Sequence, residues 1–413
     1  MTIHLNFPFE ENQEWRAKTC NLVREVRWCE DIPLTLDGSD IRNCFHHDCS
    51  SIFFGAVCHW GKAKEMRLKN IRLDQRNQES INNVLRSNSS LKRLSITNGS
   101  FHDGSFHDEG HVVDIPRSRS PCNVLQELTL ERCRMQDFTL IGRILGGASI
   151  RSLTLRNMEL DGLLSEFSPW LSKSTPLLKL DLSDSCISTE SMKMLFRSLS
   201  KNDHLKSLTI SGCHVGYAMC QALDQLLSTS SSLEMLDLAN NDIDGGMISY
   251  LTNGGLKFNK SLRTLVLSRN PIGDDGVHCL VGLLISNPTI HSLSLVDCET
   301  WGPGCSALAS GLALMKGLRV LYVDSEMDDF ADEVLASLRH NTTLRHLWTG
   351  RNTRDRTWRL VEYYLHLNRS KRQALTEFDM PLALFPVVLE GVSSNAALTY
   401  YFLRQKPDLV GMA

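Results

Sequence analysis

A nine-residue motif occurs twice near the middle of the chain, and this repetition restricts the fold more than any other feature of the sequence. Residues 233–241 are LEMLDLANN and residues 262–270 are LRTLVLSRN, so both follow the pattern L-x-x-L-x-L-x-x-N. Apolar positions 4 and 6 alternate with positions 3 and 5, as in a strand that buries one face. A motif that recurs at a fixed interval indicates a repeat protein.

The period of the repeat can be measured from the first apolar residue of each unit, which we number position 1. The repeats begin at Ala63, Leu91, Leu125, Ile150, Leu177, Leu205, Leu233, Leu262, Ile290, Leu318 and Leu344. Five of these ten steps are 28 residues long, which leaves room for a full α-helix after each strand.

On these residues, the chain resembles leucine-rich-repeat proteins of the ribonuclease-inhibitor-like superfamily. The segment GDDGVHCLVGLLISNPTI (Gly273–Ile290) is similar to that family's turn, convex helix and entry to the next strand. The resemblance covers residues 31–352. It implies an α/β solenoid of about 11–12 repeats shaped like a horseshoe, with a parallel sheet on the concave face and helices on the convex face.

The pattern predicts three regions. Residues 1–30, which are polar and aromatic, are expected to form an N-terminal cap, because a terminal repeat needs a covering element. Residues 31–352 form the solenoid, which includes a helix from Ser39 to about Trp60 and a helix-less loop at 98–121 rich in Gly, Ser, Asp and His. Residues 353–413 contain a helix at 355–367 and a strongly apolar tail, and form a helical C-terminal cap; a tail helix that docks a partner is the alternative.

Local signals place further elements. Helices are expected at Glu79–Arg86, Thr189–Leu199, Tyr217–Leu227, Asp274–Ser286 and Asp328–Arg339. Their expected N-caps are Ser188, Asp274 and Asp328. Position 9 is a small polar residue that can satisfy backbone groups where the chain leaves the strand, and it is either asparagine (Asn241, Asn270, Asn352) or cysteine (Cys133, Cys213, Cys298).

Composition limits the classes of partner and compartment. The net charge of −3 and the pI of about 6.5 provide no global basic field, so nucleic acid is disfavoured. The first residues lack a secretory apolar core, and no apolar run is long enough to span a membrane, so we expect no membrane partner. Thirteen cysteines without a paired framework favour reduced thiols, hence a cytoplasmic protein with the nucleus as the alternative. We expect the protein to be monomeric by itself.

Two clusters of metal-binding residue types were weighed and set aside. The first holds Cys44, His46, His47, Cys49, Cys58 and His59, but lacks the spacing of paired zinc knuckles. The second lies in the loop at 102–111, which holds His102, Asp103, His107, Asp108, Glu109 and His111. A glycine-rich loop does not fix ligand geometry, so a solvated loop is the simpler interpretation. We therefore expect no metal and no cofactor.

The sequence supplies no catalytic set. Phosphate-loop, serine-hydrolase and zinc-protease motifs are absent. Asp181 and Asp237 both occupy outward position 5, but two repeats apart, which predicts a separation of about 10 Å. Such a distance is too long for an acid/base pair, so these carboxylates are expected to be charges on a binding face and the protein is expected not to be an enzyme.

The concave face is the best functional signal. Its outward positions change from basic near the N-terminus (Arg67, Arg93), through mixed charge (Asp181, Asp237), to an apolar and aromatic end (Val266, Val296, Tyr322, His346, Trp348, with Arg351 just beyond). Exposed aromatics beside arginine are typical of interface hot spots. Burial of Tyr322 and Trp348 beneath the C-terminal cap is the alternative.

These observations predict a non-enzymatic scaffold that binds a protein partner on the concave face. The resemblance implies an alternative, because the family includes GTPase-activating horseshoes: a regulator of a small GTPase, which a nucleotide-hydrolysis assay against a panel of GTPases would reveal. The apolar tail argues against it, since those relatives usually end in an acidic tail. A ubiquitin-ligase receptor or an innate sensor is disfavoured, because about thirty residues precede the first expected strand.

Overall fold

The computed structural model describes most of the repeat region and little of the two ends. The described residues are 3–4, 34–37, 63–73, 75–101, 124–135, 141–142, 144–145, 149–172, 175–300, 302–324, 330–350, 356–369, 399–400 and 404. They divide into unit 1 (Met1–Cys213) and unit 2 (His214–Ala413). The expected helix at 39–60, both metal-type clusters, the N-cap Asp328, Asn352, Arg351 and nearly all of the tail beyond 369 lie outside the described residues.

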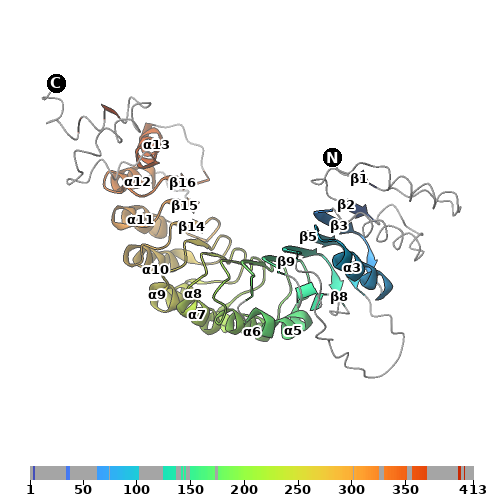
Figure 1. Cartoon of the computed structure of the whole chain (residues 1–413). Coiled ribbons are helices and arrows are strands. Elements are labelled where there is room, and N and C mark those ends of the chain that lie inside the picture. Colours follow the sequence, from blue (N-terminus) through green and yellow to red (C-terminus); the bar gives the residue numbers. More distant parts are fainter. Residues whose placement is uncertain are drawn as a thin grey trace. The chain divides into compact units, whose positions relative to one another are not determined.

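Unit 1 is a stack of parallel strands with helices along one side (Figure 1). Its neighbouring strands, in spatial order, are β1 (Ile3–His4), β2 (Leu34–Asp37), β3 (Glu65–Lys69), β5 (Arg93–Thr97), β7 (Glu127–Glu131), β9 (Ser152–Arg156), β10 (Lys179–Asp181) and β11 (Ser207–Thr209). Its helices are α3 (Gln75–Ser87), α5 (Asp161–Leu171) and α6 (Thr189–Leu199). The expected helix at 189–199 is confirmed at both ends.

Two short strands of unit 1 lie where other structure was expected. Strand β1 pairs with β2, so the segment expected to be a cap also contributes a strand. A second small parallel sheet joins β4 (Arg72–Leu73), β6 (Ser100–Phe101) and β8 (Arg134–Met135). Because β6 occupies residues 100–101, the loop predicted to begin at 98 starts with a strand.

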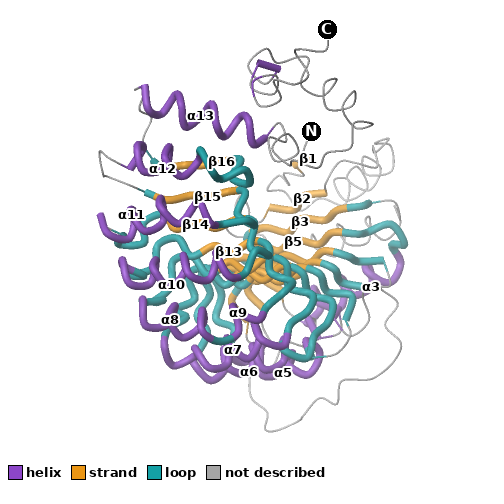
Figure 2. The backbone as a smooth tube through the Cα atoms, turned by 90° about the vertical axis from the view of Figure 1, so that its left-hand side faces the viewer, coloured by secondary structure: helices purple, strands orange, loops and turns teal. Residues whose placement is uncertain are grey.

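In unit 2 each short strand is followed by one or two helices. Its strands are β12 (Met235–Asp237), β13 (Thr264–Val266), β14 (Ser292–Leu295), β15 (Val320–Val323) and β16 (His346–Trp348), all parallel. Its helices are η1 (Tyr217–Met219), α7 (Cys220–Thr229), α8 (Gly245–Asn253), α9 (Gly255–Phe258), α10 (Gly273–Ser286), α11 (Gly302–Gly311), η2 (Leu312–Leu314), α12 (Phe330–Leu338) and α13 (Arg356–Arg369). Helices and strands form two separate layers (Figure 2), and the last helix, α13, packs on α12.

The leucines of the repeat motif form the core, as the alternation of apolar and polar residues predicts. Leu233, Leu236 and Leu238 are all buried, and so are Leu262, Leu265 and Leu267 of the next repeat. Each buried leucine side chain stabilises the fold by roughly 1.5–3 kcal/mol relative to an exposed one. Because the three leucines of one repeat stack on those of the next, the core extends along the strand stack within each unit.

Asparagine at position 9 satisfies the backbone where the chain leaves the strand. The Asn270 side-chain amide donates hydrogen bonds to the carbonyls of Leu267 (2.7 Å) and Leu238 (2.9 Å). Its oxygen accepts from the N–H groups of Asn241 and Ile243, both at 3.1 Å. Asn270 therefore satisfies backbone groups of two successive repeats at once, which confirms the role predicted for this position.

Cysteine at position 9 makes fewer of these contacts. The thiol of Cys298 donates to the carbonyl of Leu267 at 3.3 Å, and Cys133 and Cys213 make the equivalent bond to the preceding repeat. Burial raises the pKa of Cys133 and Cys213 to about 11 and that of Cys298 to about 12, so these thiols stay protonated. They are buried structural residues, as predicted.

A second row of asparagines closes the turns from helix to strand. The Asn287 amide donates to the carbonyls of Leu256 (3.0 Å) and Asn259 (2.9 Å) in the preceding repeat. Asn259 and Asn341 occupy the equivalent position in other repeats. The side-chain oxygen of each accepts a hydrogen bond from the N–H group of the leucine that opens the next repeat. Strand β13, for example, is held at both ends by buried amides, by Asn259 before it and by Asn270 after it.

The expected helix caps are confirmed in one case and wrong in another. Ser188 accepts a hydrogen bond from the N–H of Ser191 at 3.3 Å and caps α6. Asp274 does not cap α10, because the helix already begins at Gly273. Its carboxylate instead lies in the first turn, where the helix dipole favours negative charge, and accepts from the N–H of Gly304 in the next repeat at 3.0 Å.

Replacing Asn270 tests the position-9 ladder. We expect Asn270→Ala to lower the free energy of unfolding by about 2–4 kcal/mol, because it leaves buried backbone groups without partners. Asn270→Cys should cost less, since a thiol at this position still donates to a carbonyl. Denaturant unfolding of both variants measures the difference; an alanine variant as stable as the wild type would contradict the role assigned to the amide.

Thiol labelling tests the burial of the position-9 cysteines. With iodoacetamide at mildly alkaline pH, the exposed Cys186 should be alkylated, whereas Cys133, Cys213 and Cys298 should be protected by burial and by their raised pKa values. Mass-spectrometric peptide mapping separates the sites. In denaturant all four should react alike, and native labelling of Cys298 at the rate of Cys186 would show that the site is not buried as described.

Candidate functional site

Rows of side chains cross the sheet at right angles to the strands. Residues that are Cα partners in neighbouring strands stand side by side on the same face, about 4.8 Å apart. In unit 2 the position-5 row consists of Asp237, Val266, Ser294, Tyr322 and Trp348. This row changes along unit 2 from a carboxylate to two large aromatic rings.

The aromatic end of that row is a pair of interacting rings. Tyr322 on β15 and Trp348 on β16 are Cα partners, and their ring centroids lie 6.5 Å apart with the planes tilted by 46°. Both residues remain exposed, with 42% and 46% of their full surface accessible to solvent. The neighbouring pair on the same strands, Val320 and His346, is half-buried and exposed respectively. Two large rings thus stand on an accessible part of the sheet face.

Carboxylates border the aromatic pair. Asp324 follows β15 and accepts a hydrogen bond from the N–H of Asp297 at 2.8 Å. Partial burial, together with repulsion from the Asp297 carboxylate, raises the pKa of Asp324. Gly350 (φ 71°) lies between the two features, because a Cβ there would be 2.9 Å from Oδ1 of Asp324 and 3.7 Å from the Trp348 ring. Neither carboxylate was predicted as a site residue, although aspartate at positions 7 and 8 was the available signal.

The two predicted arginines of unit 1 are held by one carboxylate. Glu65 accepts from Arg67 at 2.5 Å and from Arg93 at 2.9 Å. Partial burial alone would raise the pKa of Glu65, but the hydrogen bonds and charges of the two arginines outweigh it and lower the pKa. Arg67 and Arg93 therefore lie together on the sheet face, in a network whose net charge is smaller than the sequence suggested.

The predicted carboxylates at position 5 are also engaged locally. Asp181 forms an ion pair with Arg156, and its other oxygen accepts from the hydroxyl (2.7 Å) and N–H (3.1 Å) of Ser183. These contacts outweigh the effect of burial and lower its pKa. Asp237 belongs to unit 2 and accepts from the N–H of Ala239 at 2.9 Å. Each carboxylate stabilises the turn after its own strand.

The remaining predicted residues differ in accessibility. Val266 and Val296 are half-buried on unit 2, and His346 is exposed beside Trp348. Arg351 lies outside the described residues. The structure therefore brings Tyr322, Trp348 and His346 together, while Arg67 and Arg93 form a separate group on unit 1.

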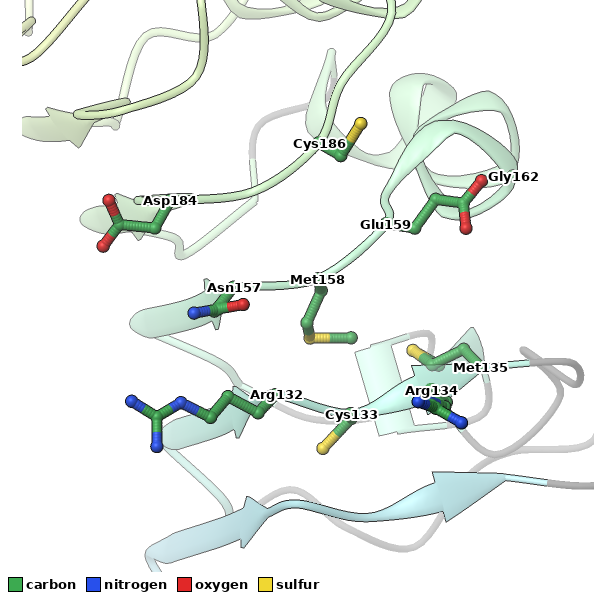
Figure 3. Close-up of a pocket in the computed structure, with 10 residues that line it drawn as sticks. All are labelled: Arg132, Cys133, Arg134, Met135, Asn157, Met158, Glu159, Gly162, Asp184 and Cys186. Atoms are coloured by element: carbon green, nitrogen blue, oxygen red, sulfur yellow. The ribbon is translucent and has the colours of Figure 1, made fainter.

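A pocket of about 860 Å³ opens on unit 1 where strands lead into helices (Figure 3). It is lined by residues of three successive repeats, namely Arg132, Cys133, Arg134, Met135, Asn157, Met158, Glu159, Gly162, Asp184 and Cys186. Arg132, Asn157 and Asp184 all have positive φ, near 55°, as do the equivalent position-8 residues of other repeats. Their conformation therefore belongs to the repeat itself.

The pocket provides no catalytic or metal-binding group that we can identify. None of its ten lining residues is a histidine that could activate the exposed Cys186, and burial keeps the Cys133 thiol protonated. No group of three or more His, Cys, Asp or Glu side chains with metal-binding geometry occurs within the described ranges. Of the described helices, none is both long and apolar enough to cross a membrane.

Comparisons with known proteins agree with this architecture. The model of the leucine-rich-repeat family matches residues 173–196 and 258–281. Pig (Sus scrofa) ribonuclease inhibitor is 31% identical over 272 residues, which cover 64% of this chain and 58% of that protein. Mouse (Mus musculus) NACHT, LRR and PYD domains-containing protein 12 is 26% identical over 320 residues, covering 70% and 28% respectively. Human (Homo sapiens) capping protein, Arp2/3 and myosin-I linker protein 3 is 29% identical over 200 residues, covering 45% and 14%.

The match with each of these relatives covers less than two thirds of the relative's own length. What they share with this chain is the repeat, whose buried leucines, position-9 asparagines and parallel strands are all present in the structure. The structure and these similarities together identify the fold as a leucine-rich-repeat solenoid of the ribonuclease-inhibitor-like type.

Proposed function

We propose that this chain is a non-enzymatic interaction scaffold whose protein partner docks on the sheet face of unit 2, with Tyr322 and Trp348 as anchors. The observation that carries the proposal is the exposed ring pair on neighbouring strands β15 and β16. Large rigid aromatic side chains cost little conformational entropy when they are fixed and contribute much apolar area on contact, so they often dominate binding energy.

The surroundings of the ring pair support docking of a protein surface. Val266 and Val320 extend the apolar area along the rows, and His346 adds a polar group beside Trp348. Asp297 and Asp324 supply charge at the border. An apolar centre with a polar rim is the usual composition of a protein–protein interface. Ribonuclease inhibitor, one of the similar proteins, is by its name an inhibitor of another protein, which supports the same class of function.

The other predicted residues fit secondary roles in this proposal. Arg67 and Arg93 are already paired with Glu65, and Asp181 is already paired with Arg156. To bind a partner, these residues would have to exchange their existing ion pairs for new ones. Exposed ion pairs contribute only about 0–1 kcal/mol each, so such exchanges would affect orientation more than affinity. We therefore assign the energetic centre to the aromatic end.

The double variant Tyr322→Ala/Trp348→Ala tests the anchors. We expect it to lower the amount of partner recovered by affinity purification at least tenfold, since each anchor is worth about 2 kcal/mol. The matched control is Tyr217→Ala/Tyr250→Ala, which removes two exposed tyrosines from unit 2 away from its strands. Quantitative mass spectrometry compares the recovered proteins.

Thermal unfolding of both variants separates lost binding from lost folding. A photo-crosslinking amino acid at position 348 should additionally capture a partner that the same group at position 217 does not. Equal partner recovery by the two double variants would refute the anchor assignment.

A further inference from the structure

In unit 2 the charged residues differ between the side of the sheet where the strands start and the side where they end. We call these two sides the edges of the repeat stack. Four connections from helix to strand, at 253–263, 285–291, 312–319 and 338–345, contain no Asp or Glu, and their seven cations are Lys257, Lys260, Arg263, Lys316, Arg319, Arg339 and Arg345. The connection before them, at 230–234, holds Glu234 and no cation and is not part of this set. The turns from strand to helix at 239–246, 268–275 and 296–300 carry six Asp or Glu residues and one arginine. Parallel strands start at one edge and end at the other, so the first set forms one continuous edge. We call it the basic edge.

Three arginines of the basic edge lie in one row together with His291, and we call this the arginine row. Hydrogen bonds join their backbones in order: His291 N–H donates to the Arg263 carbonyl (2.7 Å), Arg319 to His291 (2.8 Å) and Arg345 to Arg319 (2.8 Å). Arg319 and Arg345 are exposed, and no acidic partner for either occurs within the described part of the chain. Partial burial and the charges of Arg319 and Arg263 lower the pKa of His291, as expected in a positive field.

Large apolar side chains project from the same edge. Phe258 ends α9, Leu314 ends η2 and Ile285 lies one residue before the end of α10, and they are 67%, 60% and 39% exposed. The ammonium of Lys257 lies 6.0 Å from the centroid of the Phe258 ring. Because α9 packs on α10 and α10 on α11, these tips follow one another along the edge at helix-packing distances of about 10 Å.

Helix stability explains only part of this composition. Cations near helix C-termini and anions near N-termini are favoured by the helix dipole, which accounts for the sorting of charge. The dipole gives no reason to expose phenylalanine, leucine and isoleucine among those cations. A nucleic acid would use aromatic side chains for stacking, but Leu314 and Ile285 have no ring.

Apolar tips among lysines and arginines, in four successive connections that hold no acids, fit the boundary between lipid headgroups and acyl chains. A row of equivalent positions along a repeat edge also suits a flat surface, because successive repeats place these positions side by side.

We propose that the basic edge of unit 2 docks on an anionic phospholipid surface. The apolar tips Phe258, Ile285 and Leu314 enter the headgroup boundary. The arginine row contacts lipid phosphates, for which the guanidinium fork is well suited. Such docking differs from crossing the bilayer, and the absence of a long apolar run in the sequence excludes only the latter.

Flotation of the full chain with lipid vesicles tests the proposal. We expect binding to phosphatidylcholine vesicles that contain phosphatidylserine, little binding to phosphatidylcholine alone, and weakening by salt. Arg319→Gln/Arg345→Gln should lower the partition coefficient about 30-fold, because each cation near an anionic surface contributes about a factor of five. Phe258→Ser/Leu314→Ser should lower it at least tenfold through lost apolar insertion.

The matched control removes two arginines from outside the basic edge. Arg356→Gln/Arg359→Gln changes exposed residues in the first turn of α13 by the same charge and should bind within about twofold of the wild type. Unfolding curves confirm that every variant is folded. Equal binding to both vesicle types, or equal loss in the control and the Arg319/Arg345 variant, overturns the proposal. So does salt-dependent binding to polyglutamate or duplex DNA without binding to the anionic vesicles.

Discussion

Satisfaction of backbone groups at the ends of each strand is the constraint on which the rest of this structure depends. A repeat of about 28 residues must leave the sheet, form a helix and return, and both turns bury peptide groups. Asn270 at one turn binds carbonyls of its own and the preceding repeat, and Asn287 at the other turn binds two carbonyls of the preceding repeat, each with a single short side chain. Each amide also fixes the position of the next strand, so the register that aligns Leu236 with Leu265 is set at the strand ends as well as in the core.

This arrangement leaves the outward side chains free to vary. Leucines and asparagines account for the inner positions, whereas the position-5 row of unit 2 ranges from Asp237 to Trp348 without disturbing the register. The edges vary under one further restriction, because helices begin at one edge and end at the other and their dipoles favour opposite charges there. Function in such a protein is therefore expected on the sheet face or on an edge.

The repeat made much of this fold predictable from the sequence, and the exceptions have physical causes. Strand positions, position-9 residues and the helix at 189–199 followed from spacing alone. Helices α8 and α11 were missed because glycines in Gly245–Asn253 and Gly302–Gly311 weaken helix propensity, which packing between repeats overrides. The cap of α10 was predicted at Asp274, but the helix begins one residue earlier, at Gly273, whose φ of 64° is one that glycine adopts readily.

The candidate site was harder to predict than the fold. The repeat period predicts that Tyr322 and Trp348 point outward. It does not predict that Asp324 lies near the Trp348 ring beside Gly350, because that arrangement depends on the conformation of the turn after each strand. The ion pair Arg67–Glu65 lies within one strand, and the pair Asp181–Arg156 joins two neighbouring strands. The sequence alone does not show which of several outward residues pairs with each charged side chain. The arginine row was not predicted, because position 2 lies just before the strands begin and the apolar alternation of the strands carries no signal for it.

The two proposed surfaces of unit 2 are close enough to influence each other. Arg319 precedes Tyr322 by three residues of one extended segment, which places their Cα atoms about 10 Å apart. This distance is similar to the screening length at physiological salt, about 8 Å, so charges on one surface are felt weakly at the other. A partner that brings carboxylates to the sheet face would reduce the potential of the basic edge, while an apolar contact on Tyr322 and Trp348 would leave it unchanged. The chemistry of the partner therefore determines whether binding on the face weakens docking at the edge or leaves both surfaces occupied at once.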